Sequence, residues 1–306
     1  MHLQTEKTRL GHWAVLQKIF TEESESEPLQ LGGVLLEPES WRPAFGCVTI
    51  SSASDQCCGT GTAGIPGFPE DASEAGVSSQ IRAALHDVFM LFIAVESGSD
   101  SEIAAAGLIA QAARSMNILT ITASPRSLVA SAGQRGPRPG LAIGQLSNFA
   151  DSLLVLDDGG PAGGFGQALR RTCNLFAQAI LGASPIIPEF EDVRIVIEHG
   201  GISFMGEGEG NGPGRAGIAA GEAIARLTEI GVDMRDIPGL LCFITVRSAD
   251  RILREVQEVK SALQTLLSKS IDLVFGTIDD EAMGESLRVT LVATGLHDGR
   301  SDTRIF

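Results

Sequence analysis

The sequence predicts an α/β protein in two parts, a doubly wound parallel sheet in the N-terminal half and an α+β arrangement in the C-terminal half. Two apolar runs of strand length, residues 88–95 and 118–124, are separated by an alanine-rich helical segment at residues 102–116. Buried parallel strands are typically apolar throughout and need a helical crossover between them. From about residue 183, strands and helices follow one another without this regular alternation, which favours a separate α+β part.

Four further elements are expected in the N-terminal half. Residues 11–20 carry a helical pattern, and residues 32–39 are typical of a short strand. A Gly- and Pro-rich loop at residues 59–69 precedes a helix expected at about 70–85. The apolar run at residues 153–158 predicts a third strand, parallel and adjacent to the strands at 88–95 and 118–124.

A long helix is expected in the middle of the chain, from Gln167 to Gly182, after a hinge-like glycine-rich stretch at residues 159–166. Its apolar residues recur at spacings of four, three and four, which places them on one face. They are Leu169, Cys173, Phe176 and Ile180.

The C-terminal part is expected to contain helices, strands and one segment whose pattern fits either. Residues 192–200 are compatible with a helix or a strand, and helices are expected at residues 216–227 and 250–267. Strands are expected at residues 239–246, 271–279 and 286–295. The last two, joined by a turn at about Asp280 to Glu285, are predicted to form a closing hairpin in a sheet of their own.

Composition excludes several classes of protein. The 306 residues carry 23 Lys and Arg against 38 Asp and Glu, so the phosphate backbone of a nucleic acid would be repelled and is not an expected partner. No run approaches the roughly 20 apolar residues of a membrane span, and the first residues lack the apolar core of a secretory signal, so we expect a cytoplasmic protein. The five cysteines and five histidines show no metal-ligand or catalytic-triad spacing.

Two C-terminal segments resemble the FtsZ family of the tubulin superfamily. Residues 204–224, FMGEGEGNGPGRAGIAAGEAI, are similar to a family stretch in which Met-Gly precedes an Arg-Ala helix, and residues 272–295 are similar to its closing strands. The resemblance extends from about residue 63 to 296. It implies the tubulin/FtsZ-like fold, with a Rossmann-like GTPase domain at 1–166, a central helix at 167–182 and a C-terminal domain at 183–306.

The same resemblance implies GTP bound between consecutive subunits of a filament, held by a glycine-rich loop between a strand and a helix N-terminus. Glycines let backbone N–H groups approach phosphate oxygens, and the helix dipole favours their charge. Aligned without a gap, this chain has at that place Gly98, Ser99, Asp100, Ser101 and Glu102.

Carboxylates at Asp100 and Glu102 would oppose a triphosphate, since each pair of like charges 4 Å apart costs about 1 kcal/mol in water and more at lower dielectric. An alternative interpretation is that Ser99, Asp100 or Ser101 caps the helix, with acidic residues favourably placed near its dipole. Of the other nucleotide contacts, only Gly64, within GTAGIP, retains a recognisable loop. Gln167 is the nearest polar residue where the family reads guanine with an Asp.

A second family loop, which activates hydrolysis on the neighbouring subunit, resembles residues 183–197 of this chain. Ile187 stands where the family has an Asn, while Glu189 and Asp192 stand where it has two Asp residues that orient the attacking water. These two residues are therefore predicted as a vestigial catalytic pair. The alternative interpretation is that they and Glu191 are the acidic first turn of a helix.

The sequence thus predicts an FtsZ-like pseudo-GTPase that associates with itself or with a true FtsZ. No GTP or GDP is expected, and no direct membrane contact, because the family's membrane-tether peptide has no counterpart in residues 296–306. One alternative is an active GTP-hydrolysing FtsZ paralogue with a rearranged pocket. Another is a binding module whose cleft takes a different ligand, such as a cation near four carboxylates: Asp100, Glu102, Asp157 and Asp158.

Overall fold

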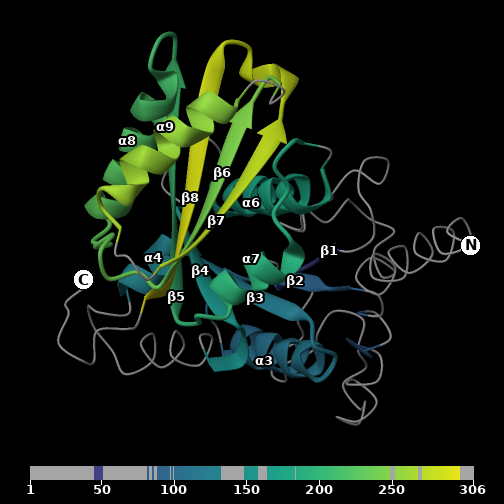
Figure 1. Cartoon of the computed structure of the whole chain (residues 1–306). Helices are drawn as coiled ribbons and strands as arrows, with labels where there is room; N and C mark the ends of the chain where they lie inside the picture. Colours follow the sequence, from purple (N-terminus) through teal and green to yellow (C-terminus); the bar gives the residue numbers. More distant parts are fainter. Residues whose placement is uncertain are drawn as a thin grey trace, which may run out of the picture. The chain divides into compact units, whose positions relative to one another are not determined.

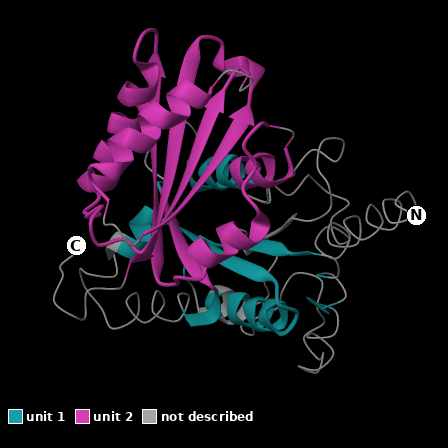
Figure 2. Ribbon diagram, viewed as in Figure 1, with its two compact units in different colours: residues 1–150, 157–173 teal, residues 151–156, 174–306 magenta. Residues whose placement is uncertain are grey.

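The computed structural model describes residues 45–50, 81–82, 85, 88–96, 98, 100–131, 148–157, 164–182, 184–248, 252–267 and 271–296. The expected helix at 11–20, strand at 32–39 and loop at 59–69 lie outside these residues, as does most of the expected helix at 70–85. The chain divides into two compact units (Figure 2). Unit 1 comprises residues 1–150 and 157–173, and unit 2 comprises residues 151–156 and 174–306.

Unit 1 contains the parallel sheet that the apolar runs predict. Its strands are β1 (Phe45–Ile50), β2 (Met90–Val95) and β3 (Leu119–Pro125), and β2 pairs in parallel with β1 on one side and β3 on the other. Helix α3 (Asp100–Ser115) makes the crossover, and the short helix α4 (Arg126–Ser131) follows β3. Every residue of β2 and β3 is buried, which explains why both strands are continuously apolar or small.

Unit 2 is built on a mixed sheet in the order β4-β5-β8-β6-β7. The strands are β4 (Ser152–Leu156), β5 (Ile202–Asn211), β6 (Gly239–Val246), β7 (Asp272–Asp279) and β8 (Ser286–Leu296). β4 is parallel to β5, β8 is antiparallel to both β5 and β6, and β7 is parallel to β6.

The predicted closing hairpin is wrong. β7 and β8 do not pair with each other, because β6 lies between them and hydrogen-bonds to both. The prediction that these two strands form a separate sheet is also wrong. β4, which corresponds to the apolar run at 153–158, pairs with β5, β5 pairs with β8, and β8 pairs with β6, so all belong to one sheet. The η1 turn (Glu281–Met283) connects β7 to β8 across the end of β6.

Helices cover both faces of the sheet in unit 2. α8 (Arg215–Glu229) and α9 (Leu253–Gln264) lie over one face (Figure 1). α7 (Phe190–Ile197) and the second half of α6 (Gly164–Leu181) lie over the other, where Phe176 packs edge-on against Phe243 with ring centroids 5.4 Å apart. The segment at 192–200 is therefore helical through Ile197, and α6 begins at Gly164 rather than at Gln167. Within the described residues no helix is long and apolar enough to cross a bilayer.

β5 was not expected as a strand, because its sequence ISFMGEGEGN lacks apolar alternation. Its glycines at 206, 208 and 210 all face α8, and a Cβ at Gly206 would lie 2.5 Å from the Ala223 carbonyl oxygen. A Cβ at Gly210 would overlap the Arg215 carbonyl oxygen. The glycine stripe lets α8 lie directly on the strand, so backbone contact replaces the side-chain packing that strand patterns depend on.

Candidate functional site

The turn between β2 and α3 lies at the place where the sequence predicted the vestigial phosphate loop. β2 ends at Val95, Gly98 adopts φ 66°, and α3 begins at Asp100. This strand–turn–helix unit lies at the carboxyl end of parallel strands, where helix N-terminal N–H groups bind anions in many α/β proteins.

Gly98 is explained by the fold without any ligand. Its positive φ is one that residues with a Cβ rarely adopt. An added Cβ would also lie 2.9 Å from Leu128 Cδ1, on α4. The positive φ of the turn therefore accounts for the remaining family glycine.

The other predicted residues of this loop are placed in the first turn of α3. Asp100, Ser101 and Glu102 belong to that turn, so two acidic residues start the helix that would meet the phosphates. Acidic residues stabilise a helix N-terminus and disfavour an anion there. Ser99 and Gly64 lie outside the described residues.

The cation alternative gains no support from the described part of the chain. Asp157 follows β4 and is exposed, while Asp158 lies outside the described residues. Among the residues that are described, no group of three or more His, Cys, Asp or Glu side chains is arranged to hold a metal ion.

The predicted activating loop is fixed to the edge strand β7 in unit 2. The Thr277 N–H donates to the Ile186 carbonyl at 2.8 Å, and the Ile186 N–H donates to Thr277 Oγ1 at 3.1 Å. Ser184 Oγ shares a hydrogen bond with Thr277 Oγ1 at 2.8 Å and lies 3.3 Å from Asp279 Oδ1. Hydrogen bonds to the backbone and to the side chain of Thr277 therefore hold residues 184–186 against β7.

Beyond this anchor, the loop presents its acidic residues at the surface. Glu189 occupies the N-cap position of α7 with extended backbone, but its side chain makes no capping hydrogen bond. Asp192 is exposed in the first turn, and Ile187 is 44% exposed. Glu191 lies 3.5 Å from Arg194, so it belongs to an ion pair along the helix. The acidic-first-turn interpretation is confirmed for Glu191 and Asp192, and Glu189 remains available for other contacts.

Comparison with known proteins finds similarity to one family. Residues 201–297 match the family described as FtsZ family, C-terminal domain. The cell division protein FtsZ of Coxiella burnetii is 29% identical over 251 residues, which are 78% of this chain and 64% of that protein. A solved FtsZ mutant from M. jannaschii has a TM-score of 0.63 at 23% identity, covering 72% of this chain and 70% of that chain. A solved empty FtsZ dimer from M. jannaschii has a TM-score of 0.61 at 22% identity, covering 76% and 70%.

These similarities support a relationship of the chain to the FtsZ/tubulin superfamily. The tubulin/FtsZ-like fold class that the sequence predicted is thereby confirmed. The family match begins just before β5 and ends just after β8, so it lies within unit 2, where the resemblance in the sequence is strongest. The chain spans about six tenths of the length of the curated relatives that it matches.

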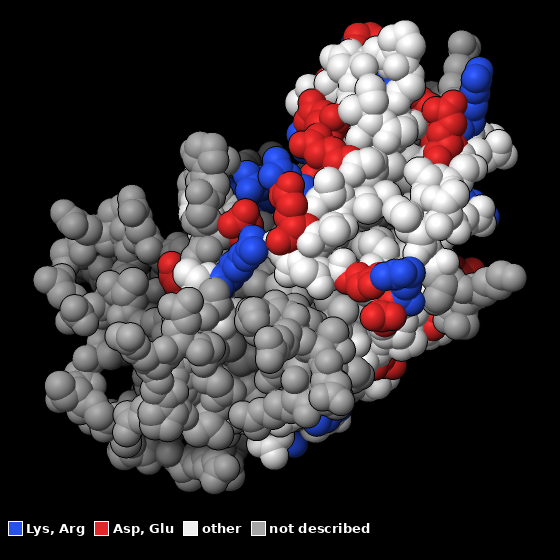
Figure 3. Space-filling view, turned by 90° about the vertical axis from the view of Figure 1, so that its left-hand side faces the viewer, with Lys and Arg blue, Asp and Glu red and all other residues white. Residues whose placement is uncertain are grey.

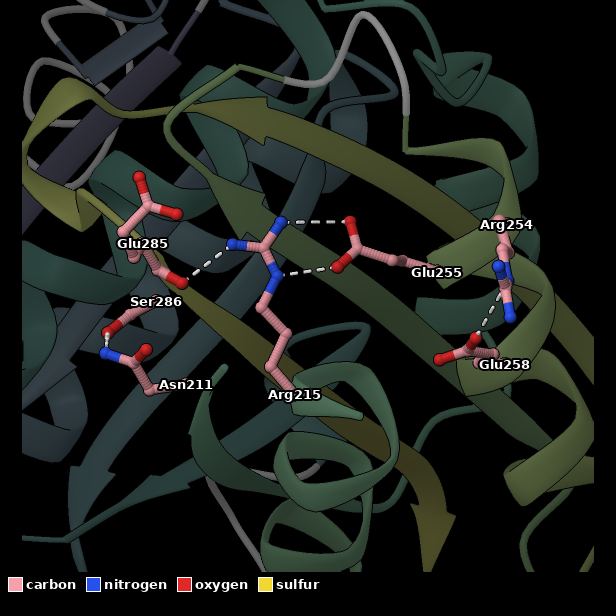
Figure 4. Close-up of polar contacts among 7 residues, drawn as sticks. All are labelled: Asn211, Arg215, Arg254, Glu255, Glu258, Glu285 and Ser286. Atoms are coloured by element: carbon pink, nitrogen blue, oxygen red, sulfur yellow. Dashed lines mark hydrogen bonds and ion pairs between the residues drawn. The ribbon is translucent and has the colours of Figure 1, made fainter. Parts of the chain in front are cut away.

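In this FtsZ-like chain the Arg-Ala motif has a structural role that the sequence did not reveal. Arg215 Nε and Nη2 donate to the two carboxylate oxygens of Glu255 at 2.6 and 3.0 Å, and Nη1 donates to the Glu285 carbonyl at 2.7 Å (Figure 4). The Glu255 carboxylate raises the pKa of Arg215. One guanidinium thus joins α8, α9 and the turn before β8, and its fork geometry could not be supplied by Lys.

Proposed function

We propose that this chain is a cytoplasmic FtsZ-like cytoskeletal or cell-division protein that acts as a pseudo-GTPase. It self-associates, or it binds and modulates filaments of a true FtsZ. Self-association is consistent with the dimer seen for the similar M. jannaschii FtsZ.

The observation that carries the proposal is the acidic start of α3. Asp100 and Glu102 belong to the first turn of this helix, and in the sequence Gly98 has a serine on either side. Carboxylates near a phosphate oppose its binding, because both are negatively charged. A Cβ in place of a glycine hydrogen also keeps the phosphate away from the backbone N–H groups.

The surface at α7 supports the filament-modulating part of the proposal. Glu189 and Asp192 are exposed, and the segment before them is fixed to β7 through Thr277. Because the loop is held before it meets a partner, docking costs less ordering entropy. A chain that keeps this acidic surface but does not bind nucleotide would contribute to a filament contact from one side only. We therefore infer that it caps or modulates filaments at one end.

The alternative, an active GTPase with a rearranged pocket, is favoured by one observation. The β2–α3 turn keeps a strand–turn–helix path with a left-handed glycine at Gly98. An active pocket would have to place the phosphates so that the carboxylates of the first turn point away from them.

Nucleotide content and turnover test the pseudo-GTPase proposal. The purified protein should release no GTP or GDP on denaturation, should not bind a fluorescent GTP analogue at micromolar concentration, and should show no phosphate release. FtsZ from the same cell is the positive control. Stoichiometric guanine nucleotide, or turnover that is lost with Gly98→Ala, would instead establish the active-GTPase alternative.

Mixing with that FtsZ tests the modulating role. The wild-type protein should shorten filaments and change GTP turnover, and the Glu189→Ala/Asp192→Ala variant should do neither. A matched variant, Glu229→Ala/Asp236→Ala, removes the same charge from exposed positions elsewhere in unit 2 and should behave as wild type. The proposal fails if the wild-type protein changes neither quantity, and the acidic loop is not responsible if both double variants behave alike.

A further inference from the structure

The second half of β5 is an open edge of the sheet in unit 2. β4 pairs with β5 only along Ile202 to Phe204, whereas β8 pairs with β5 as far as Asn211. In the part of the chain that the structure describes, no strand lies beside Glu207 to Asn211 on the side away from β8. An unpaired edge presents N–H and C=O groups that can bind another extended chain.

The direction of these backbone groups follows from one contact. The Glu209 N–H donates to Glu222 Oε2 at 3.1 Å, so it points away from β8. Because bonding alternates along an antiparallel pair, the N–H and C=O groups of Glu207 and Asn211 point the same way. This edge therefore presents a regular ladder, in which α8 occupies one donor through the Glu222 carboxylate.

α8 forms one wall along this edge. A Cβ at Gly208 would lie 2.7 Å from Glu222 Cβ, which shows how closely the helix approaches the strand. Ile218 lies one turn before Glu222 on the same side of α8 and is 54% exposed. A chain lying along β5 would thus meet an apolar side chain and a carboxylate on the helix above it.

The charges along this edge favour a basic occupant. Three carboxylates are opposed by two guanidinium groups, and Figure 3 shows acidic and basic side chains in several separate groups on the face seen from the left of Figure 1. These are Glu207, Glu209 and Glu222 against Arg226 and Arg288. A hydrogen bond from Arg288 lowers the pKa of Glu209.

Pairing with a second copy through the same edge is disfavoured. Glu207 and Glu209 alternate along β5 and project to the same face. Two antiparallel copies would bring these carboxylates together across the new ladder, and like charges directly opposite each other destabilise strand pairing. A strand with Lys or Arg at alternate positions would meet them favourably.

We propose that the edge formed by Glu207 to Asn211 binds an extended segment of a partner protein by strand addition, with Lys or Arg at alternate positions of that segment and an apolar residue against Ile218. The incoming carbonyl replaces the Glu222 carboxylate on the Glu209 N–H. This surface is separate from the β2–α3 turn and the α7 loop, so the inference is independent of the pseudo-GTPase proposal.

The test uses the full chain and a peptide of alternating Lys and Val, about eight residues long to match the strand. The matched control peptide has Glu in place of Lys. The Lys peptide should slow amide hydrogen exchange at Glu207 and Asn211 by at least about tenfold, with affinity that falls as salt rises, and the Glu peptide should do neither.

Two variants at Glu207 separate strand addition from simple charge attraction. Glu207→Pro removes an N–H that points away from β8 and breaks no hydrogen bond to β8. It should therefore weaken binding of the Lys peptide by at least about tenfold. Glu207→Gln keeps the N–H and should weaken binding of the Lys peptide only a few fold. Equal binding of the two peptides, protection elsewhere than at β5, or equal effects of the two substitutions would overturn the proposal. Should Glu207→Pro not fold, the comparison of the two peptides on the wild-type chain decides alone.

Discussion

Replacing Gly208 by Ala tests how tightly α8 lies on β5. The new Cβ would overlap the Ala219 carbonyl oxygen and lie 2.5 Å from the Ala223 backbone nitrogen. Both obstacles are backbone atoms of a helix whose inward residues are fully buried, so no side chain can rotate away. The helix must move by about 1 Å, and the expected loss in free energy of unfolding is about 3 kcal/mol, at the upper end for overpacking.

A matched control is available on α8 itself. Gly221 is exposed, and a Cβ there would meet nothing within 4 Å. Gly221→Ala should therefore stabilise the protein by about 0.5–1 kcal/mol through helix propensity alone. The same chemical change is thus expected to have opposite effects on stability at Gly208, inside the strand–helix contact, and at Gly221, on the exposed side of α8.

Urea unfolding followed by circular dichroism measures both variants. The Gly208→Ala midpoint should fall and the Gly221→Ala midpoint should rise, with similar slopes, so that the shift reports stability. If Gly208→Ala unfolds at the wild-type urea concentration or above, α8 does not lie on the glycine stripe and the packing argument is refuted.

Three further predictions concern polar contacts in unit 2. Arg215→Lys loses the fork on Glu255 and should lower the free energy of unfolding by about 1.5–3 kcal/mol in urea, while a loss under about 0.5 kcal/mol would contradict the role given to the guanidinium. Thr277→Val should lower the free energy of unfolding by about 1–2 kcal/mol and speed amide exchange in the loop before α7. Thr277→Ser should keep both the stability and the exchange rate near wild type. The hydrogen bond from Arg235 lowers the pKa of Asp233 from 3.8 to about 2, so its stabilising effect should be complete above pH 4 and disappear as pH falls toward 2. Side-chain NMR titration should show that pKa return toward 3.8 in Arg235→Ala, and an unchanged pKa would exclude the pair as its cause.

The sequence predicted those elements whose residues carry their own signal. β2, β3 and β6 are buried along their whole length, and their continuous apolar character identified them. β5 carried no such signal, because its packing face is glycine and its other face carries Glu207 and Glu209. A glycine stripe alternating with polar residues ahead of a small-residue helix was the available clue.

The sequence could not predict which residues far apart along the chain contact one another. Arg215 meets residues 40 and 70 positions away, and the position of β8 between β5 and β6 depends on pairings that no local pattern encodes. For the candidate site, the sequence placed Asp100 and Glu102 at a helix start and Glu189 beside another. It could not show that Gly98 adopts a positive φ, nor that Thr277 anchors the loop.

The central position of β8 has a consequence for how the protein is made. β8 is the last of the described strands to leave the ribosome, yet it separates β5 from β6 and hydrogen-bonds to both. Until residues 286–296 have been synthesised, β5 and the apolar strand β6 have inner edges without a neighbour. The sheet of unit 2 therefore closes only after translation of β8, and a chaperone bound earlier would have those two edges to protect.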